Sequence, residues 1–180
     1  PAEARGFGIA LSLIGLAVLT YTRPLAAGLA LATIATYILI YTPLKCRTPL
    51  ATVVGAVPGA LPAALGWVAA NGSMTLEAWV LFGIVFLWQI PHFLAIAWIY
   101  REDFARAGFQ VLPVVEPSGR RTARYVLLFL AGLLPVSLAP AWVGMAGTPY
   151  LLGAALLGFG FAALSARFAL HRSMQNARNL

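Results

Sequence analysis

Residues 88–116 read WQIPHFLAIAWIYREDFARAGFQVLPVVE, an apolar segment that leads into a charged loop. The apolar part contains Gln89 and His92, and polar side chains at membrane depth usually serve a function. Counted along a helix, Gln89, His92 and Asp103 occupy positions i, i+3 and i+14, so His92 and Asp103 are expected on one face. At ~1.5 Å of rise per residue they lie roughly 16 Å apart along the axis, which leaves room for a large amphipathic substrate.

The composition excludes a water-soluble domain. Of the 180 residues, 61% are hydrophobic and 9% are charged, which is typical of an integral membrane protein. Apolar runs long enough to span a bilayer predict six transmembrane helices, at about 6–22, 24–41, 50–70, 76–100, 123–143 and 149–167. No polar linker separates these runs. The sequence therefore predicts an all-α membrane protein with one domain over residues 1–180.

The basic residues predict the orientation of these helices. If successive spans alternate in direction, eleven of the twelve Lys and Arg residues fall on one side of the membrane and only Arg23 falls on the other. The positive-inside rule then places loops 42–49 and 101–122 in the cytoplasm, or in the equivalent compartment of an organelle. This topology accounts for the net charge of +7, so nucleic-acid binding is not indicated. The eleven residues are Arg5, Lys45, Arg47, Arg101, Arg106, Arg120, Arg121, Arg124, Arg167, Arg172 and Arg178.

Two adjacent acids, Glu102 and Asp103, follow the fourth predicted span and lie between Arg101 and Arg106. Mg²⁺ prefers one or two carboxylates together with phosphate oxygens, and nearby cations neutralise the remaining phosphate charge. The loop therefore fits a metal and phosphate site. It fits equally a helix end exposed to solvent, and spacing alone does not separate the two interpretations.

The turn between the second and third predicted spans contains Lys45 and Arg47, with Pro43 on one side of them. Two cations in a conformationally restricted turn can bind an anion, or they can anchor the spans at lipid headgroups. Cys46 lies between them and is the only cysteine. An intrachain disulfide is thus excluded, and no zinc motif is present.

Small residues recur along the third predicted span, which contains Gly55 and Gly59 together with Pro58 and Pro62. Small residues four positions apart let helix backbones approach closely. Helix packing is therefore the favoured interpretation, and a broken-helix transport site is the alternative.

His92 and the aromatic residues near the span ends each allow more than one role. His92 can ligate haem iron, contact a substrate, relay a proton or bond to a backbone carbonyl in the core. Trp and Tyr residues near span ends, among them Tyr41 and Trp98, are expected to be interfacial anchors.

Three runs carry a family resemblance: PAEARGFGI at 1–9, YTPLKCRTPLATVVGAVPGALPAALGW at 41–67, and residues 88–116 quoted above. Together they resemble the haem O synthases, or protohaem IX farnesyltransferases, within the UbiA-type intramembrane prenyltransferases. The resemblance implies a bundle of nine transmembrane helices, of which the six spans here correspond to the third to eighth. It also implies that the chain is an internal fragment that lacks the first of two acidic motifs, and that this fragment alone is inactive.

The resemblance also implies roles for individual residues. Asp103 is then the second acidic motif, with Glu102 in support as a second ligand of Mg²⁺. Lys45 and Arg47 become the residues that bind the diphosphate, although Cys46 departs from the basic residue usual in that run. The expected substrate contacts are His92 toward haem, together with Gln89 and Arg101.

The implied reaction transfers a farnesyl group from farnesyl diphosphate to the vinyl group of haem B, with addition of water, and yields haem O and diphosphate. The implied partners are the lipid bilayer and, in assembly, haem A synthase or a terminal oxidase. A bacterial inner membrane is the expected location, with the mitochondrial inner membrane as the alternative. A quinone-type prenyltransferase and a small transporter are the competing functions; the first would show a repeated Asp pattern after the fourth span, which is absent.

Overall fold

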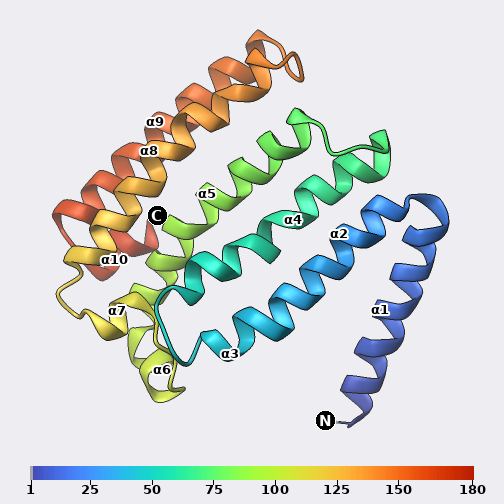
Figure 1. The fold of residues 1–180 in the computed structure, drawn as a ribbon. Helices are drawn as coiled ribbons and strands as arrows, with labels where there is room; N and C mark the ends of the chain where they lie inside the picture. Colours follow the sequence, from blue (N-terminus) through green and yellow to red (C-terminus); the bar gives the residue numbers. More distant parts are fainter. Residues whose placement is uncertain (1) are drawn as a thin grey trace.

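The structure is a computed structural model that describes residues 2–180, and all its regular elements over that range are helices (Figure 1). Six helices are long and apolar enough to cross a membrane, which confirms the predicted fold class. Five of them are α1 (Ala2–Thr22), α4 (Ala51–Asn71), α5 (Leu76–Ile99), α8 (Arg120–Trp142) and α9 (Thr148–Leu170). The sixth is continuous through α2 (Pro24–Ala35), η1 (Thr36–Tyr41) and α3 (Thr42–Leu44). The short helices are α6 (Arg101–Arg106), α7 (Leu112–Val115) and α10 (Met174–Arg178).

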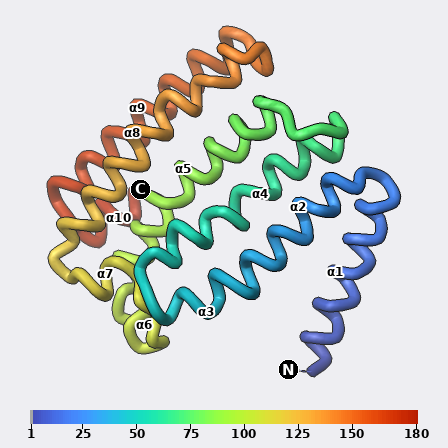
Figure 2. Tube along the Cα trace, in the orientation of Figure 1, coloured from blue at the N-terminus to red at the C-terminus, as the bar shows by residue number. Residues whose placement is uncertain are grey.

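Each long helix packs against the next one along the chain, from α1 to α9. The Cα trace shows α1, α2, α4 and α5 side by side, with the α8 and α9 pair on the far side of α5 (Figure 2). Because successive helices alternate in direction, the connections 45–50 and 100–119 lie at one end of the bundle together with α10 (Figure 1). We call this the Lys45 end.

The second membrane helix contains a π-helical turn, η1, which the sequence analysis did not predict. Thr42 donates both its backbone N–H and its hydroxyl to the Tyr37 carbonyl, the hydroxyl at 2.9 Å. Pro43 has no N–H with which to continue an ordinary helical turn, so the wider turn supplies an alternative bonding pattern. The rings of Tyr37 and Tyr41, four positions apart in this segment, lie with centroids 5.2 Å apart.

The largest buried apolar cluster gathers at the Lys45 end around α5. It contains Ile90, Leu94 and Trp98 of α5, packed with Val126 of α8 and Phe168 of α9. The Trp98 and Phe168 rings meet edge to face at 5.9 Å, and Trp98 is 5% exposed. The expectation that Trp98 anchors the interface is therefore wrong, because its ring is part of the core.

The fourth membrane helix ends earlier than the helical count from His92 to Asp103 requires. Helix α5 runs through Pro91 and stops at Ile99, and Tyr100 has φ −103° and ψ 25°. Asp103 belongs to the separate helix α6, so the prediction that it shares one continuous helical face with His92 is wrong. The apolar sequence ends at Tyr100, and the charged residues that follow leave the axis of the membrane helix.

Gly119 occupies the junction of three helical segments. Its φ of 71° lies in the left-handed region, and a Cβ there would lie 2.6 Å from the Trp98 ring and 2.9 Å from Arg172 Cδ. Gly144 has a similar φ of 77°, and a Cβ at that position would have no neighbour within 4 Å. A residue with a side chain would therefore strain the backbone at either site, whereas a steric conflict would arise only at Gly119.

We expect Gly119→Ala to lower the free energy of unfolding by about 2–4 kcal/mol, because strain and overpacking add. Gly144→Ala should cost only about 1 kcal/mol, from strain alone. Thermal and denaturant unfolding in detergent measure both variants. Equal losses would show that Trp98 does not restrict this position.

Candidate functional site

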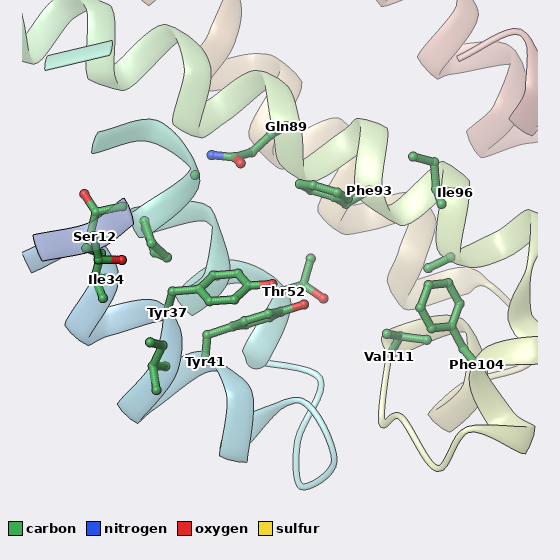
Figure 3. Close-up of a pocket in the computed structure, with 16 residues that line it drawn as sticks. Ser12, Ile34, Tyr37, Tyr41, Thr52, Gln89, Phe93, Ile96, Phe104 and Val111 are labelled. Carbon is green, nitrogen blue, oxygen red and sulfur yellow. The ribbon is translucent and has the colours of Figure 1, made fainter. Parts of the chain in front are cut away.

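A cavity of about 660 Å³ lies between the second membrane helix, α4, α5 and the segment that contains α6. Figure 3 shows its walls, with Tyr37 and Tyr41 on one side, Gln89, Phe93 and Ile96 on another, and Phe104 and Val111 toward the Lys45 end. Most of the lining is apolar or aromatic. Such a cavity fits an apolar chain better than a small polar solute.

A buried hydrogen bond between α5 and α4 fixes one wall of the cavity. Gln89 is 5% exposed, and its Nε2 donates to the Ala56 carbonyl at 2.7 Å. The absence of a side chain at Gly59 makes the approach possible, since a Cβ there would collide with Gln89 Oε1. The close packing predicted for the third span is thus present at Gly59. Gln89, predicted as a substrate contact, lines the cavity.

The opposite wall carries hydroxyl groups. Tyr37, Tyr41 and Thr52 line the cavity, and Figure 3 shows both tyrosine side chains extending from η1 toward Thr52. A Cβ at Gly55 would lie 2.6 Å from the Tyr41 ring, so this glycine makes room for the ring. Tyr41, expected to be an interfacial anchor, instead forms part of the cavity wall.

Lys45 joins two loops that are far apart in sequence. Its carbonyl accepts a hydrogen bond from the Gln110 backbone N–H at 2.9 Å. Its ammonium lies 5.1 Å from the Phe109 ring centroid and 6.0 Å from that of Tyr41, distances at which the cation is attracted to the faces of the rings. Since Tyr41 lines the cavity, the lysine charge is held beside the cavity at the Lys45 end.

Asp103 and this lysine have a common neighbour, Phe109. Asp103 lines a hollow of about 270 Å³ with Phe104 and Phe109, the second of which contacts Lys45. Its carboxylate pairs with the exposed guanidinium of Arg106. Phe104 also lines the larger cavity, so the predicted acid and the predicted cation flank the same end of it.

The other predicted charges are less clearly directed toward the hollow. Glu102 is exposed and is not among the residues that line it; neighbouring helical positions do not face each other. Arg101 places its guanidinium 5.0 Å from the Trp98 ring centroid, on the side of the core. Arg47 is exposed in the turn, where its backbone N–H bonds to the Leu44 carbonyl at 2.9 Å.

The acids at this end suit a metal ion that is shared with a phosphate rather than one enclosed by protein. Within residues 2–180, no group of three or more His, Cys, Asp or Glu side chains is placed to hold a metal. Mg²⁺ commonly retains waters and takes one or two carboxylates plus substrate phosphate oxygens. The exposed carboxylates of Asp103 and Glu102 meet that smaller requirement, and Asp103 is the better placed of the two.

His92 does not join the other predicted site residues. Its ring stacks on Trp88 with centroids 5.1 Å apart and planes at 12°. His92 is not among the described residues that line the 660 Å³ cavity. Trp88 lines a different groove, of about 910 Å³, between α5, α8 and α9.

The arrangement of long apolar helices, an apolar cavity and a charged end defines a membrane protein that can hold an amphipathic anion. The profile of the UbiA prenyltransferase family matches residues 1–180. The chain belongs to this family, which confirms the resemblance found in the sequence.

Similar relatives include bacterial proteins named protoheme IX farnesyltransferase. The chain is 51% identical to the one from Solibacter usitatus over 179 residues, which cover 99% of the chain and 61% of the relative. It is 50% identical to the one from Koribacter versatilis, over 76% of the chain and 44% of the relative, and 42% identical to the one from Myxococcus xanthus, over 92% and 56%. The chain thus spans about half to three fifths of the length of these relatives.

A solved structure described as digeranylgeranylglyceryl phosphate synthase has the same fold. The TM-score is 0.82 at 18% identity, with 98% of this chain and 62% of that chain covered. At this identity the similarity supports the helical architecture alone. The six apolar helices and the match to the UbiA prenyltransferase family confirm the predicted integral membrane protein.

Several residues of the cavity were not predicted. Tyr37, Thr52 and Phe104 carry no motif of their own, and only the packing of their helices around the cavity brings them together. Tyr41 had a detectable signal, since it precedes Lys45 by four residues and so shares a helical face with it.

We expect Gly59→Ala to destabilise the protein by about 1–3 kcal/mol, because the added methyl displaces the Gln89 amide from its bond to Ala56. Gly66→Ala is the matched control in the same helix, with nothing within 4 Å of its Cβ position, and should be neutral or slightly stabilising. Unfolding in detergent measures both. Equal behaviour of the two variants would contradict the close approach at Gly59.

Proposed function

We propose that this chain forms the prenyl-binding part of an enzyme that transfers a farnesyl group from farnesyl diphosphate to a vinyl group of haem B, with addition of water, yielding haem O and diphosphate. The observation that carries the proposal is the apolar cavity with Lys45 held beside one end. Relatives with the corresponding name, at 42–51% identity, support the substrate pair.

The prenyl diphosphate has the same division of polarity as the site. Its apolar chain would lie in the cavity along Phe93 and Ile96, and its diphosphate would lie among Lys45, Arg47 and the carboxylate of Asp103. Lys45 and Arg47 would neutralise phosphate charge, which lowers the barrier to breaking the allylic C–O bond. Mg²⁺, when bound by Asp103 with Glu102 in support, would supply further charge neutralisation.

Bond changes in the proposed reaction balance without an oxidant. The C–O bond of the allylic diphosphate breaks, and its electron pair leaves with the diphosphate. The π bond of the haem B vinyl group breaks, and its electron pair forms the new C–C bond to the farnesyl carbon. Water then adds to the electron-deficient adjacent carbon and loses one proton, which leaves the hydroxyl group there. The aromatic walls at Tyr37 and Phe93 would exclude bulk water from the developing carbocation and offer it the faces of their rings.

We place the haem contact at His92. Its half-buried ring stacks on Trp88. This stacking fixes the orientation of the His92 imidazole, which belongs to the same helix as the cavity residues of α5. Gln89 and Arg101 are the further substrate contacts in this proposal. Of these, Gln89 is supported by its place in the cavity wall, and Arg101 only by its charge at the Lys45 end.

We infer that the membrane is a bacterial inner membrane and that the Lys45 end faces the cytoplasm. The support is the location of eleven of the twelve basic residues on that side and the bacterial origin of the relatives.

The function is tested by haem O formation from haem B, farnesyl diphosphate and Mg²⁺, followed by mass-resolved chromatography. The assay compares this chain with the same chain joined to the flanking segments of the Solibacter usitatus relative. Haem O from either protein supports the proposal. Absence of haem O from both, when each is folded by circular dichroism and elutes as a single species, would overturn it; a prenylated quinone precursor under the same conditions would indicate a quinone-type enzyme.

In the protein that gives product, Asp103→Asn should reduce kcat/KM on the order of 100-fold, because one charge that organises the leaving group is lost. The matched control is Glu77→Gln, which removes an acid from the opposite end of α5 and should leave turnover near that of the unmodified protein. Mg²⁺ titration should require higher metal concentrations only for Asp103→Asn. Normal kinetics and metal dependence in that variant would reject the role of Asp103.

His92→Ala should weaken haem binding more than farnesyl diphosphate binding, because the ring lies next to Trp88 rather than in the cavity wall. Separate titrations, by haem absorbance and by displacement of a fluorescent prenyl diphosphate analogue, measure the two affinities. The opposite ranking would count against a haem contact at His92.

A further inference from the structure

Three arginines surround a groove on the far side of α5 from the cavity. Arg120 and Arg124 come from the first turns of α8, and Arg172 follows the end of α9. The groove has a volume of about 390 Å³. None of these residues has a part in the proposed prenyl transfer.

No ion pair neutralises the positive charge of this groove in the described residues. Over the part of the chain that the structure describes, the one ion pair joins Arg106 and Asp103, so none of the three groove arginines is paired. The nearby acid Glu116 accepts hydrogen bonds from the Ser118 hydroxyl and, at 3.0 Å, from the Arg121 N–H. The hydrogen bond from Ser118 and, to a smaller extent, the Arg121 N–H and the charges of Arg121 and Arg120 lower the pKa of Glu116. Glu116 therefore offsets part of the Arg120 charge, whereas Arg124 and Arg172 form no ion pair with any described residue.

The arginines lie where positive charge is unfavourable, at the N-terminal end of α8, and a bound anion would relieve this repulsion. Helix α8 has basic residues and no acid in its first turn, although the N-terminal end of a helix favours negative charge. Arg172 is held in place, because its guanidinium donates to the Ala169 carbonyl at 3.1 Å. An anion bound here would interact with three guanidinium groups at once.

The floor of the groove is apolar and continues into the membrane-spanning part of both helices. Leu127 of α8 is 41% exposed and Leu170 of α9 is 73% exposed, and Ala123, Ala166 and Ala169 leave space between them. A free inorganic anion would gain nothing from this floor. An acyl chain would cover it while its headgroup met the arginines.

We propose that this groove binds an anionic phospholipid, with the phosphate between Arg120, Arg124 and Arg172 and an acyl chain along Leu127 and Leu170. The charge of the groove complements the headgroup, and its apolar floor complements the chain. Binding at this position would hold the start of α8 against the end of α9, next to the junction at Gly119, where Arg172 already lies close to the backbone.

The test compares two triple variants with the same change of charge. Arg120→Gln, Arg124→Gln and Arg172→Gln together remove the groove charges. Arg5→Gln, Arg167→Gln and Arg178→Gln together remove three basic residues of the same membrane side that do not line the groove. Each delipidated protein is titrated with phosphatidylglycerol and with phosphatidylcholine, and bound lipid is counted by native mass spectrometry.

Phosphatidylglycerol should bind the groove variant roughly 100-fold more weakly than the unmodified chain, at about a factor of 5 for each lost arginine, while the control triple retains binding. A triple Lys variant at positions 120, 124 and 172 should largely restore it, which separates loss of charge from misfolding. Equal weakening in both Gln triples would overturn the proposal, since binding would then reflect only the charge of the surface. Displacement of the lipid by inorganic phosphate or diphosphate at equal concentration would also overturn it, in favour of a site for a free anion.

Discussion

The hydrogen bond from Gln89 Nε2 to the Ala56 carbonyl, at 2.7 Å, is the contact on which the cavity depends. A primary amide buried among apolar helices is costly unless it has a partner. Because Gly59 leaves room for the amide, α5 can approach α4 closely enough to make the bond. The register of these two helices then determines where Phe93 and Ile96 lie across the cavity from the tyrosines of the second membrane helix (Figure 3).

A second contact organises the charged end in a similar way. The Gln110 N–H donates a hydrogen bond to the Lys45 carbonyl at 2.9 Å, and the lysine ammonium lies over the Phe109 ring. The loop that follows α6 is thereby joined to the turn that follows α3. Residues separated by more than fifty positions are brought together, so a cation and an acid flank one end of an apolar cavity. A division of this kind is suited to a molecule with an anionic head and a long apolar tail.

The sequence predicted the membrane helices well because long apolar runs depend on local composition alone. Gln89 was predicted as a substrate contact, and its side chain lines the cavity; its contact with a substrate, like that of His92, stays a prediction. The relation of His92 to Asp103 could not be predicted by counting, because Tyr100 interrupts the helix and directs α6 away from its axis. The roles of Tyr41 and Trp98 were missed for a related reason: both lie near span ends, and only tertiary packing decides whether such rings face lipid, a cavity or the core. The assignment of Asp103, Lys45, Arg47, Glu102 and Arg101 to substrate or metal stays a prediction.

We expect the prenyl chain to occupy the cavity between the second membrane helix, α4 and α5. This expectation is tested most directly by photocrosslinking with a farnesyl diphosphate analogue that carries a diazirine at the far end of its chain, followed by peptide mapping. We expect label on the cavity wall, in residues 52–59 of α4 and 89–97 of α5, and its loss when unlabelled farnesyl diphosphate is present in excess. Label confined to the groove between α8 and α9, near Trp88 and Leu157, would contradict it.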